Sequence, residues 1–282
     1  MKKTALLTTL VALAALNAHA GTAISDKVPI VDPDPLFTGS IATGYDSEYY
    51  FRGLWFSSNN VWSSANFSFP LADNLSLGLG ALYTSSASTD INMPPTIGNL
   101  DYSELDLTAS LNYDAQWARF GLVFTNYNFF DTFSGSINGG SFGLPGSRDS
   151  FITDARDLGL TMAVPIGSAT IYLAGYYDFR IDAPYGEVGA DYTFAISDRL
   201  SLVPSVNLGY GSNYYSYPEQ PGNPKSGLTA VRLGLSAPFK ITEGLTFTPY
   251  IAANLAQDIR ERLNVVRGQD DVFAGAALSY SF

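Results

Sequence analysis

The sequence predicts an all-β protein, a single closed antiparallel transmembrane β-barrel of about 12 strands. Apolar side chains recur at every second position in segments of strand length, and the connections between these segments are alternately short and long. A strand points successive side chains to opposite faces, and a barrel strand meets lipid on one face and the lumen on the other. Short turns at one end and long loops at the other complete the barrel pattern.

The C-terminal segment, residues 272–282, shows the alternation most clearly. One face carries the larger apolar side chains, namely Val272, Ala274, Ala276, Leu278, Tyr280 and Phe282. This segment resembles the C-terminal recognition strand of Gram-negative outer-membrane barrels, which ends in an aromatic residue. The resemblance implies that Tyr280 and Phe282 form the membrane-insertion signal, and that barrel-assembly machinery is a partner during insertion.

The N-terminus predicts export. A basic start at Lys2 and Lys3, an apolar run and a small-x-small site predict a signal peptide over residues 1–20, cleaved between Ala20 and Gly21. A retained N-terminal anchor is the minor alternative, because the run is too short for a spanning helix. Residues 21–35 contain three prolines and are interpreted as a periplasmic lead-in, and residues 36–282 as the barrel domain in the cell outer membrane.

Eleven alternating segments precede the C-terminal strand. They cover residues 37–45, 61–69, 75–83, 105–113, 120–124, 158–164, 171–179, 188–194, 200–210, 231–239 and 245–253. None of their outward positions carries a charged side chain, and such a side chain would cost about 2–4 kcal/mol at the middle of the membrane. Arg156 is an exception only if its strand begins that early. Pro204 and Pro249 fall within strands, where each removes a ladder donor, so we expect bulges there.

Composition agrees with this fold and excludes several functions. Loss of residues 1–20 leaves 13 basic against 26 acidic residues, a net charge of −13, which argues against a basic surface for nucleic acid. Cysteine is absent, so disulfide and thiol chemistry do not contribute. The 18 tyrosines, 18 phenylalanines and 26 glycines suit a barrel, since lipid-facing and lumen-facing residues average to a middling hydropathy.

The block Tyr49-Tyr-Phe-Arg-Gly-Leu54 follows the first strand. With the residues before it, Gly44 to Gly53, it resembles the TorF-type family of outer-membrane porins, whose members carry a Tyr-x-Phe-Arg-Gly-like block after their first strand. The likeness is best over residues 39–83, and the strand pattern extends it to Phe282. The resemblance implies a small barrel and does not specify its substrate.

Charged residues collect on the inward parity and are the candidates for pore-lining groups. They are Asp46, Glu48, Glu104, Asp106, Asp157, Asp178, Glu187, Asp191, Arg52, Arg119, Arg180 and Arg232. Facing walls of opposite charge orient solutes across water, whereas touching walls form ion pairs that close a narrow barrel. About eight strands give a filled barrel and about 16 an open one, so twelve leaves both alternatives. For Arg52 we favour a structural pair with Asp46 or Glu48 over a free constriction cation.

The expected function is that of a porin-like channel for passive diffusion of small hydrophilic solutes, with a lean towards cations because acids are in excess. A non-conducting structural or adhesion barrel is the alternative, and a barrel-embedded lipid-modifying enzyme is weaker. The only histidine, His19, lies in the signal peptide, so we assign no catalytic residue, metal or cofactor. Lipid and lipopolysaccharide are the expected partners, with a homo-oligomer left open. We interpret Trp55, Trp62 and Trp117 as interfacial girdle residues.

Overall fold

The computed structural model describes residues 36–86, 89–93, 96–130, 132–137, 140–142, 154–214, 226–258, 262–263 and 266–282. The predicted signal peptide and lead-in, residues 1–35, therefore lie outside the described residues. Within the described part of the chain, no helix is long and apolar enough to cross a membrane.

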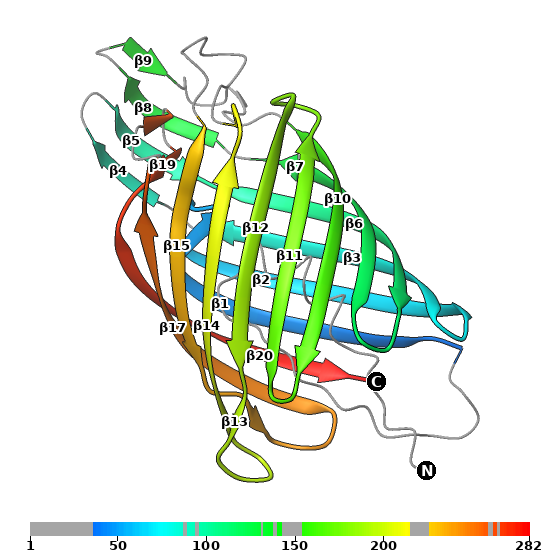
Figure 1. The fold of residues 1–282 in the computed structure, drawn as a ribbon. Helices are drawn as coiled ribbons and strands as arrows, with labels where there is room; N and C mark the ends of the chain where they lie inside the picture. Colours follow the sequence, from blue (N-terminus) through cyan, green and yellow to red (C-terminus); the bar gives the residue numbers. More distant parts are fainter. Residues whose placement is uncertain are drawn as a thin grey trace.

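Twelve strands form a closed antiparallel barrel, as the sequence predicts (Figure 1). They are β1 (Thr38–Phe51), β2 (Leu54–Ala72), β3 (Leu75–Ser86), β6 (Ser103–Asp114), β7 (Arg119–Phe129), β10 (Ala155–Ile166), β11 (Ala169–Asp178), β12 (Ala183–Tyr192), β14 (Ser201–Gly211), β15 (Gly227–Ser236), β17 (Leu245–Ala256) and β20 (Asp271–Ser281). Each strand pairs with the next in this order, and β20 pairs with β1 to close the ring.

The two ends of the barrel differ, again as predicted. One end, called here the long-loop end, carries a four-stranded sheet of β4 (Thr89–Met93), β5 (Thr96–Asp101), β8 (Thr132–Ile137) and β9 (Gly140–Phe142) (Figure 1). The short strands β18 (Arg262–Leu263) and β19 (Val266–Gly268) belong to the last loop of that end. The opposite, short-turn end carries β13 (Phe194–Ala195), β16 (Phe239–Lys240) and the C-terminus.

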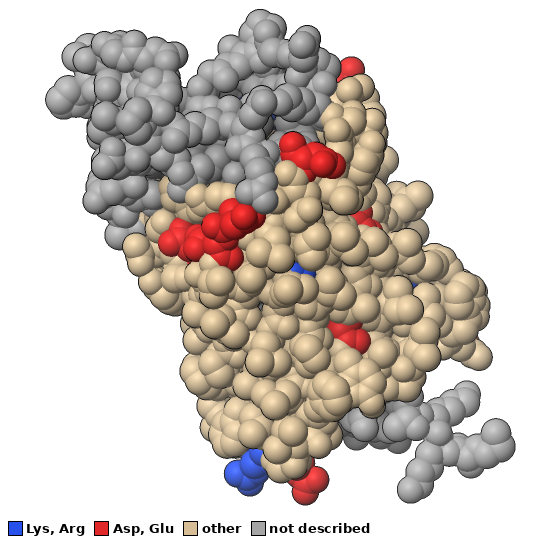
Figure 2. Space-filling model, turned by 60° about the vertical axis from the view of Figure 1, so that its left-hand side comes forward, with Lys and Arg blue, Asp and Glu red and all other residues tan. Residues whose placement is uncertain are grey.

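Side chains of the wall alternate between exposed and buried positions. In β17 and along most of β10, buried side chains alternate with side chains that are exposed or half-buried on the outer surface, and Leu160 is 68% exposed. At the short-turn end, Phe282 packs against Phe37 and Phe67, with ring centroids 6.3 Å apart in both pairs. Figure 2 shows a face made mostly of uncharged residues, with acidic side chains gathered towards its upper end. Arg156 is an outward charge, since β10 begins at Ala155, and it donates to Asn126 at 3.0 Å.

The prediction of bulges at the two prolines is wrong. Pro204 pairs with Leu235 and Pro249 pairs with Ala276, without a register shift at either place. Instead the neighbouring strand is interrupted at each proline: β12 ends before β13 begins, and β15 ends before β16 begins. Each missing N–H therefore falls where the adjacent ladder is already broken.

Inward-facing glycines underlie aromatic rings from the next strand. A Cβ on Gly189 would lie 2.1 Å from the Tyr172 ring, and one on Gly159 would lie 2.4 Å from the Tyr176 ring. In the same way, the Tyr250 ring packs over Gly275 and the Trp62 ring packs over Gly44. These rings lie along the wall because glycine leaves room for them, and so they do not project across the lumen.

Candidate functional site

The first hairpin of the chain leaves the wall at the long-loop end. The ladder between β1 and β20 ends at Asp46–Gly275, and the ladder between β2 and β3 ends at Asn60–Ser86. Pairing between β1 and β2 nevertheless continues up to Phe51–Leu54. Residues 47–59, called here the inward hairpin, therefore pair with each other and, at Leu54 and Trp55, with β19.

Local sequence explains the bend and the turn of the inward hairpin. The register between the two strands shifts between Tyr49 and Tyr50, where Phe56 of β2 is the extra, unpaired residue of a bulge that increases the local twist. On the same strand, Asn59 has φ 56°, a left-handed conformation that asparagine tolerates better than most residues. At the tip, Arg52 (φ 51°) and Gly53 (φ 81°) are both left-handed, as a two-residue hairpin turn of type I′ requires.

Contacts with distant strands place the tip of the hairpin inside the lumen. The Tyr49 hydroxyl donates to Glu104 of β6 at 2.9 Å, and the Phe51 ring lies 5.4 Å from that of Tyr127 on β7. On the other side of the ring, Asn254 of β17 donates to the Gly53 carbonyl at 3.3 Å. Strands on several sides of the ring thus contact one tip, which only a tip within the lumen allows. The hairpin therefore narrows the lumen at this level.

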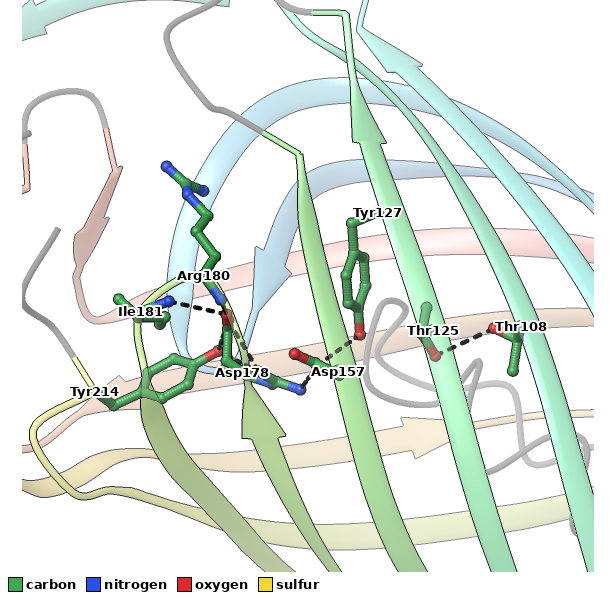
Figure 3. A network of polar contacts seen from close by, with 9 residues as sticks. Thr108, Thr125, Tyr127, Asp157, Asp178, Arg180, Ile181 and Tyr214 are labelled. Atoms are coloured by element: carbon green, nitrogen blue, oxygen red, sulfur yellow. Dashed lines mark hydrogen bonds and ion pairs between the residues drawn. The ribbon is translucent and has the colours of Figure 1, made fainter. Parts of the chain in front are cut away.

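Arg52 at the tip reaches the wall across the ring. Its Nη2 pairs with Asp157 of β10, and its Nη1 lies 3.8 Å from Asp178 of β11. Nη1 also donates to the Tyr214 hydroxyl, which in turn donates to Asp178 at 3.1 Å. Tyr127 donates to Asp157 at 3.1 Å, so the network joins residues from β7, β10, β11 and the segment after β14 (Figure 3).

Aromatic rings surround the same guanidinium. Its Cζ lies 4.7 Å from the ring centroid of Phe51, 4.9 Å from those of Tyr176 and Tyr185, and 5.3 Å from that of Tyr214. A desolvated cation–π contact contributes about 2 kcal/mol. Burial raises the pKa of the Tyr214 phenol, which keeps it neutral and able to donate. We call the wall residues of this site the guanidinium cage: Asp157, Tyr176, Asp178, Tyr185 and Tyr214.

The expected pairing of Arg52 with Asp46 or Glu48 is wrong. Asp46 accepts a hydrogen bond from Tyr250 at 2.5 Å, and Glu48 accepts from Trp55 and Ser58, both at 2.6 Å. These acids lie below the tip on the hairpin's own strand, whereas Arg52 is carried across the lumen. The bend in the hairpin, rather than sequence distance, selects the partner.

The other predicted lumen residues near the long-loop end are acids on β6 and an arginine after β11. Glu104 accepts from Tyr102 at 2.5 Å as well as from Tyr49, and both Glu104 and Asp106 are buried. The backbone N–H of Arg180 donates to Asp178 at 2.9 Å, while its side chain extends away from Asp157 (Figure 3).

The remaining candidates are distributed from the level of the hairpin to the short-turn end. Arg232 donates to the Tyr50 carbonyl at 3.4 Å, and Glu187 accepts from Asn207 at 3.2 Å. Asp191 pairs in register with Thr170, close to the short-turn end. Arg119 lies at that end, 3.4 Å from Asp114 on the adjacent strand. The structure therefore brings Arg52, Asp157 and Asp178 together, and distributes the other charges along the lumen.

The tyrosines of the cage and the inward hairpin were not predicted. Trp55 and Trp62 are buried, so their interpretation as girdle residues is wrong, while Trp117 is exposed. One signal was available: the run Leu54-Trp55-Phe56 after the turn is apolar at consecutive positions, which breaks the alternation of a wall strand. All three side chains are buried, because both faces of the hairpin are enclosed by the barrel.

No family model and no curated relative matches the sequence. Solved structures share its fold. An outer-membrane channel from Pseudomonas putida F1 is 14% identical with a TM-score of 0.50, over 90% of this chain and 100% of that one. The β domain of the Bordetella autotransporter BrkA is 12% identical with a TM-score of 0.50, over 88% and 100%. The NanC porin is 7% identical with a TM-score of 0.50, over 86% and 100%. The chain has the fold of outer-membrane β-barrels.

Proposed function

We propose that the protein is a porin-like channel of the outer membrane, which passes small hydrophilic solutes by diffusion and prefers cations. The observation that carries the proposal is the acidic lumen of a closed barrel whose outer surface is apolar. Asp46, Glu104 and Asp106 are buried in the barrel interior, whereas the Arg52 charge is balanced by Asp157 and Asp178. Fixed carboxylates favour entry of cations over anions.

The inward hairpin sets how much of the lumen is open at the long-loop end. Below it, the rings of Tyr172 and Tyr250 lie along the wall over glycines, which keeps the lumen clear of their side chains. The narrowest level of the channel is therefore that of the hairpin tip, and solutes pass beside the tip or when it shifts. Selectivity is determined there by Glu104, Asp106 and the guanidinium cage.

Conductance in planar bilayers tests this function. The purified protein is expected to form pores whose reversal potential in a KCl gradient shows potassium preference. Neutralising Glu104 and Asp106 together, as Glu104→Gln/Asp106→Asn, is expected to reduce that preference. A sealed membrane at high protein would contradict the channel, and anion preference would contradict the cation selectivity.

A non-conducting barrel is the second candidate, and the filled long-loop end favours it. Tyr49, Tyr50, Leu54, Trp55 and Phe56 are 1–4% exposed, so the hairpin packs within the barrel as a protein core does. In this function the barrel is structural, or presents its long loops for adhesion or recognition. Sealed bilayers both with the wild type and with a variant that has lost the Arg52 contacts would support it.

The same proposal includes the family and the setting of the protein. Membership of the TorF-type porins rests on the block from Gly44 to Gly53, and insertion through Tyr280 and Phe282 rests on the alternating last strand. Lipid, lipopolysaccharide and the barrel-assembly machinery are the partners that follow from an outer-membrane location. We assign no enzymatic activity.

A further inference from the structure

None of the residues of the guanidinium cage belongs to the inward hairpin. Asp157 comes from β10, Tyr176 and Asp178 from β11, Tyr185 from β12, and Tyr214 from the segment after β14. The hairpin contributes the cation itself and the ring of Phe51. The residues outside the hairpin place two carboxylates and three tyrosine rings around the guanidinium, which is a site built for a planar cation.

This wall requires a cation. Asp157 and Asp178 lie directly opposite each other in the ladder between β10 and β11. Like charges in that relation destabilise a sheet, and here their side chains are only 1% and 7% exposed, so water screens them little. A positive charge between the two carboxylates offsets this repulsion.

The contacts recognise the end of a guanidinium group. Nη1 and Nη2 of Arg52 make the polar contacts, whereas Nε has no hydrogen-bond partner among the described residues. The rings contact the planar carbon centre. Delocalised planar charge, two terminal donors and weak hydration distinguish this group from a lysine-type ammonium.

We propose that the cage is a binding site for guanidinium-bearing solutes, and that Arg52 is its tethered occupant. A free solute of this class competes with Arg52 and releases the inward hairpin from the far wall. Arg52 is tethered to the hairpin and competes for the cage at an effective concentration in roughly the millimolar range. A free solute therefore binds the wild type weakly. The transport consequence rests on the proposed channel function, whereas binding to the cage does not.

Calorimetric titration of the full chain in detergent tests the binding. The probe is L-arginine amide, and L-citrulline amide serves as the control, since it has nearly the same shape without the guanidinium charge. We expect Arg52→Ala to bind L-arginine amide at least tenfold more tightly than the wild type, because the competitor is gone. Asp157→Asn added to Arg52→Ala is expected to reduce this binding at least tenfold.

Arg119→Ala is the matched control variant, because it removes a lumen arginine that is remote from the cage. It is expected to bind L-arginine amide as the wild type does. Absence of saturable binding to Arg52→Ala, or equal binding of L-citrulline amide, would overturn the site. Circular dichroism establishes that each variant retains the barrel, and Arg52→Gln replaces Arg52→Ala if the latter does not fold.

A readout in the wild type does not depend on any variant. Trp55 is buried in the inward hairpin, so displacement of Arg52 is expected to increase acrylamide quenching of tryptophan fluorescence as L-arginine amide is added. L-citrulline amide should leave quenching unchanged, and unchanged quenching with both probes at saturation would contradict release of the hairpin.

Bilayer currents separate this inference from the proposed function. Binding to the cage with sealed bilayers would overturn the channel and leave the site. Cation-selective pores in a protein that shows no binding would overturn the site and leave the channel. If both hold, L-arginine amide is expected to increase wild-type conductance, with little change in Arg52→Ala.

Discussion

Two arginine–aspartate pairs occupy opposite ends of the lumen. Arg119 and Asp114 face each other on adjacent strands, 3.4 Å apart, with side chains 6% and 27% exposed. Arg52 and Asp157 are separated by 105 residues, and both side chains are 1% exposed. The first pair closes a local turn, whereas the second ties an inward hairpin to the far wall.

This difference shows that one pairing of residue types can serve two purposes. An ion pair near the surface contributes about 0–1 kcal/mol, because water and salt compete for its charges. A buried pair is weak evidence for net stability, but removal of one partner costs about 3–5 kcal/mol, since the other charge stays buried without compensation. The Arg52 pair therefore fixes the position of a segment, and its effect on stability is seen when one partner is removed.

The largest expected effect is that of Arg52→Ala compared with Arg119→Ala. Loss of Arg52 leaves two buried carboxylates, so we expect a decrease of about 3–5 kcal/mol in the free energy of unfolding, against about 0–1 kcal/mol for Arg119→Ala. Denaturant unfolding in lipid vesicles measures both values. Equal losses would remove the distinction between the two ends.

A double variant sharpens the interpretation of the first result. Arg52→Ala/Asp157→Asn removes one of the carboxylates that Arg52→Ala leaves uncompensated, so it should be less destabilised than the sum of the two single variants. The expected coupling is about 1–3 kcal/mol, the range for residues in one network. Additive losses would show that Arg52 acts through its ring contacts alone.

Two glycines test how the wall below the hairpin is packed. A Cβ on Gly189 meets the Tyr172 ring, whereas a Cβ on Gly175 has open space around it. Gly189→Ala should therefore cost about 1–3 kcal/mol by overpacking, and Gly175→Ala should be nearly neutral. Unfolding measurements give the stabilities, and a smaller single-channel conductance in Gly189→Ala would show that the displaced ring enters the lumen.

The smallest expected effect is a difference in salt dependence. The cost of Asp114→Asn should be at most about 1 kcal/mol and should vanish at 1 M salt, where screening extends only about 3 Å. The cost of Asp157→Asn should persist, since its partner is buried. The measurement is the unfolding free energy of each variant at low and high salt; loss of both effects in salt would contradict the enclosed position of the Arg52 site.

The wall strands could be predicted from the sequence because apolar side chains that face outwards alternate with other side chains that face the lumen along each strand. The parity of residues 272–282 recurs in eleven earlier segments, and every predicted strand has a counterpart in the barrel. The four-stranded sheet of β4, β5, β8 and β9 was not predicted, since its strands are only three to six residues long and lie in segments that were interpreted as loops.

The site was less predictable than the wall. Arg52, Asp157 and Asp178 were recognised as lumen candidates, but their meeting depends on a bend of the hairpin across the ring. Short sequence separation favoured Asp46 as the partner of Arg52, but in the structure Asp46 accepts a hydrogen bond from Tyr250. Which charged side chains pair across the lumen depends on how the closed barrel brings the strands together, and the sequence of a single strand does not indicate it.

The inward hairpin lies beside the seam where the ring closes. β1 is the first strand and meets the last strand, β20, along a ladder from Ser40–Ser281 to Asp46–Gly275. The groups that hold the tip, from Asp157 to Asn254, are all synthesised after it, and the enclosure exists only when β20 reaches β1. Contacts so distant along the chain carry a loop-closure entropy cost that slows folding. We therefore expect closure of the barrel wall and enclosure of the inward hairpin to occur in one folding step, after the last strand, β20, has been synthesised.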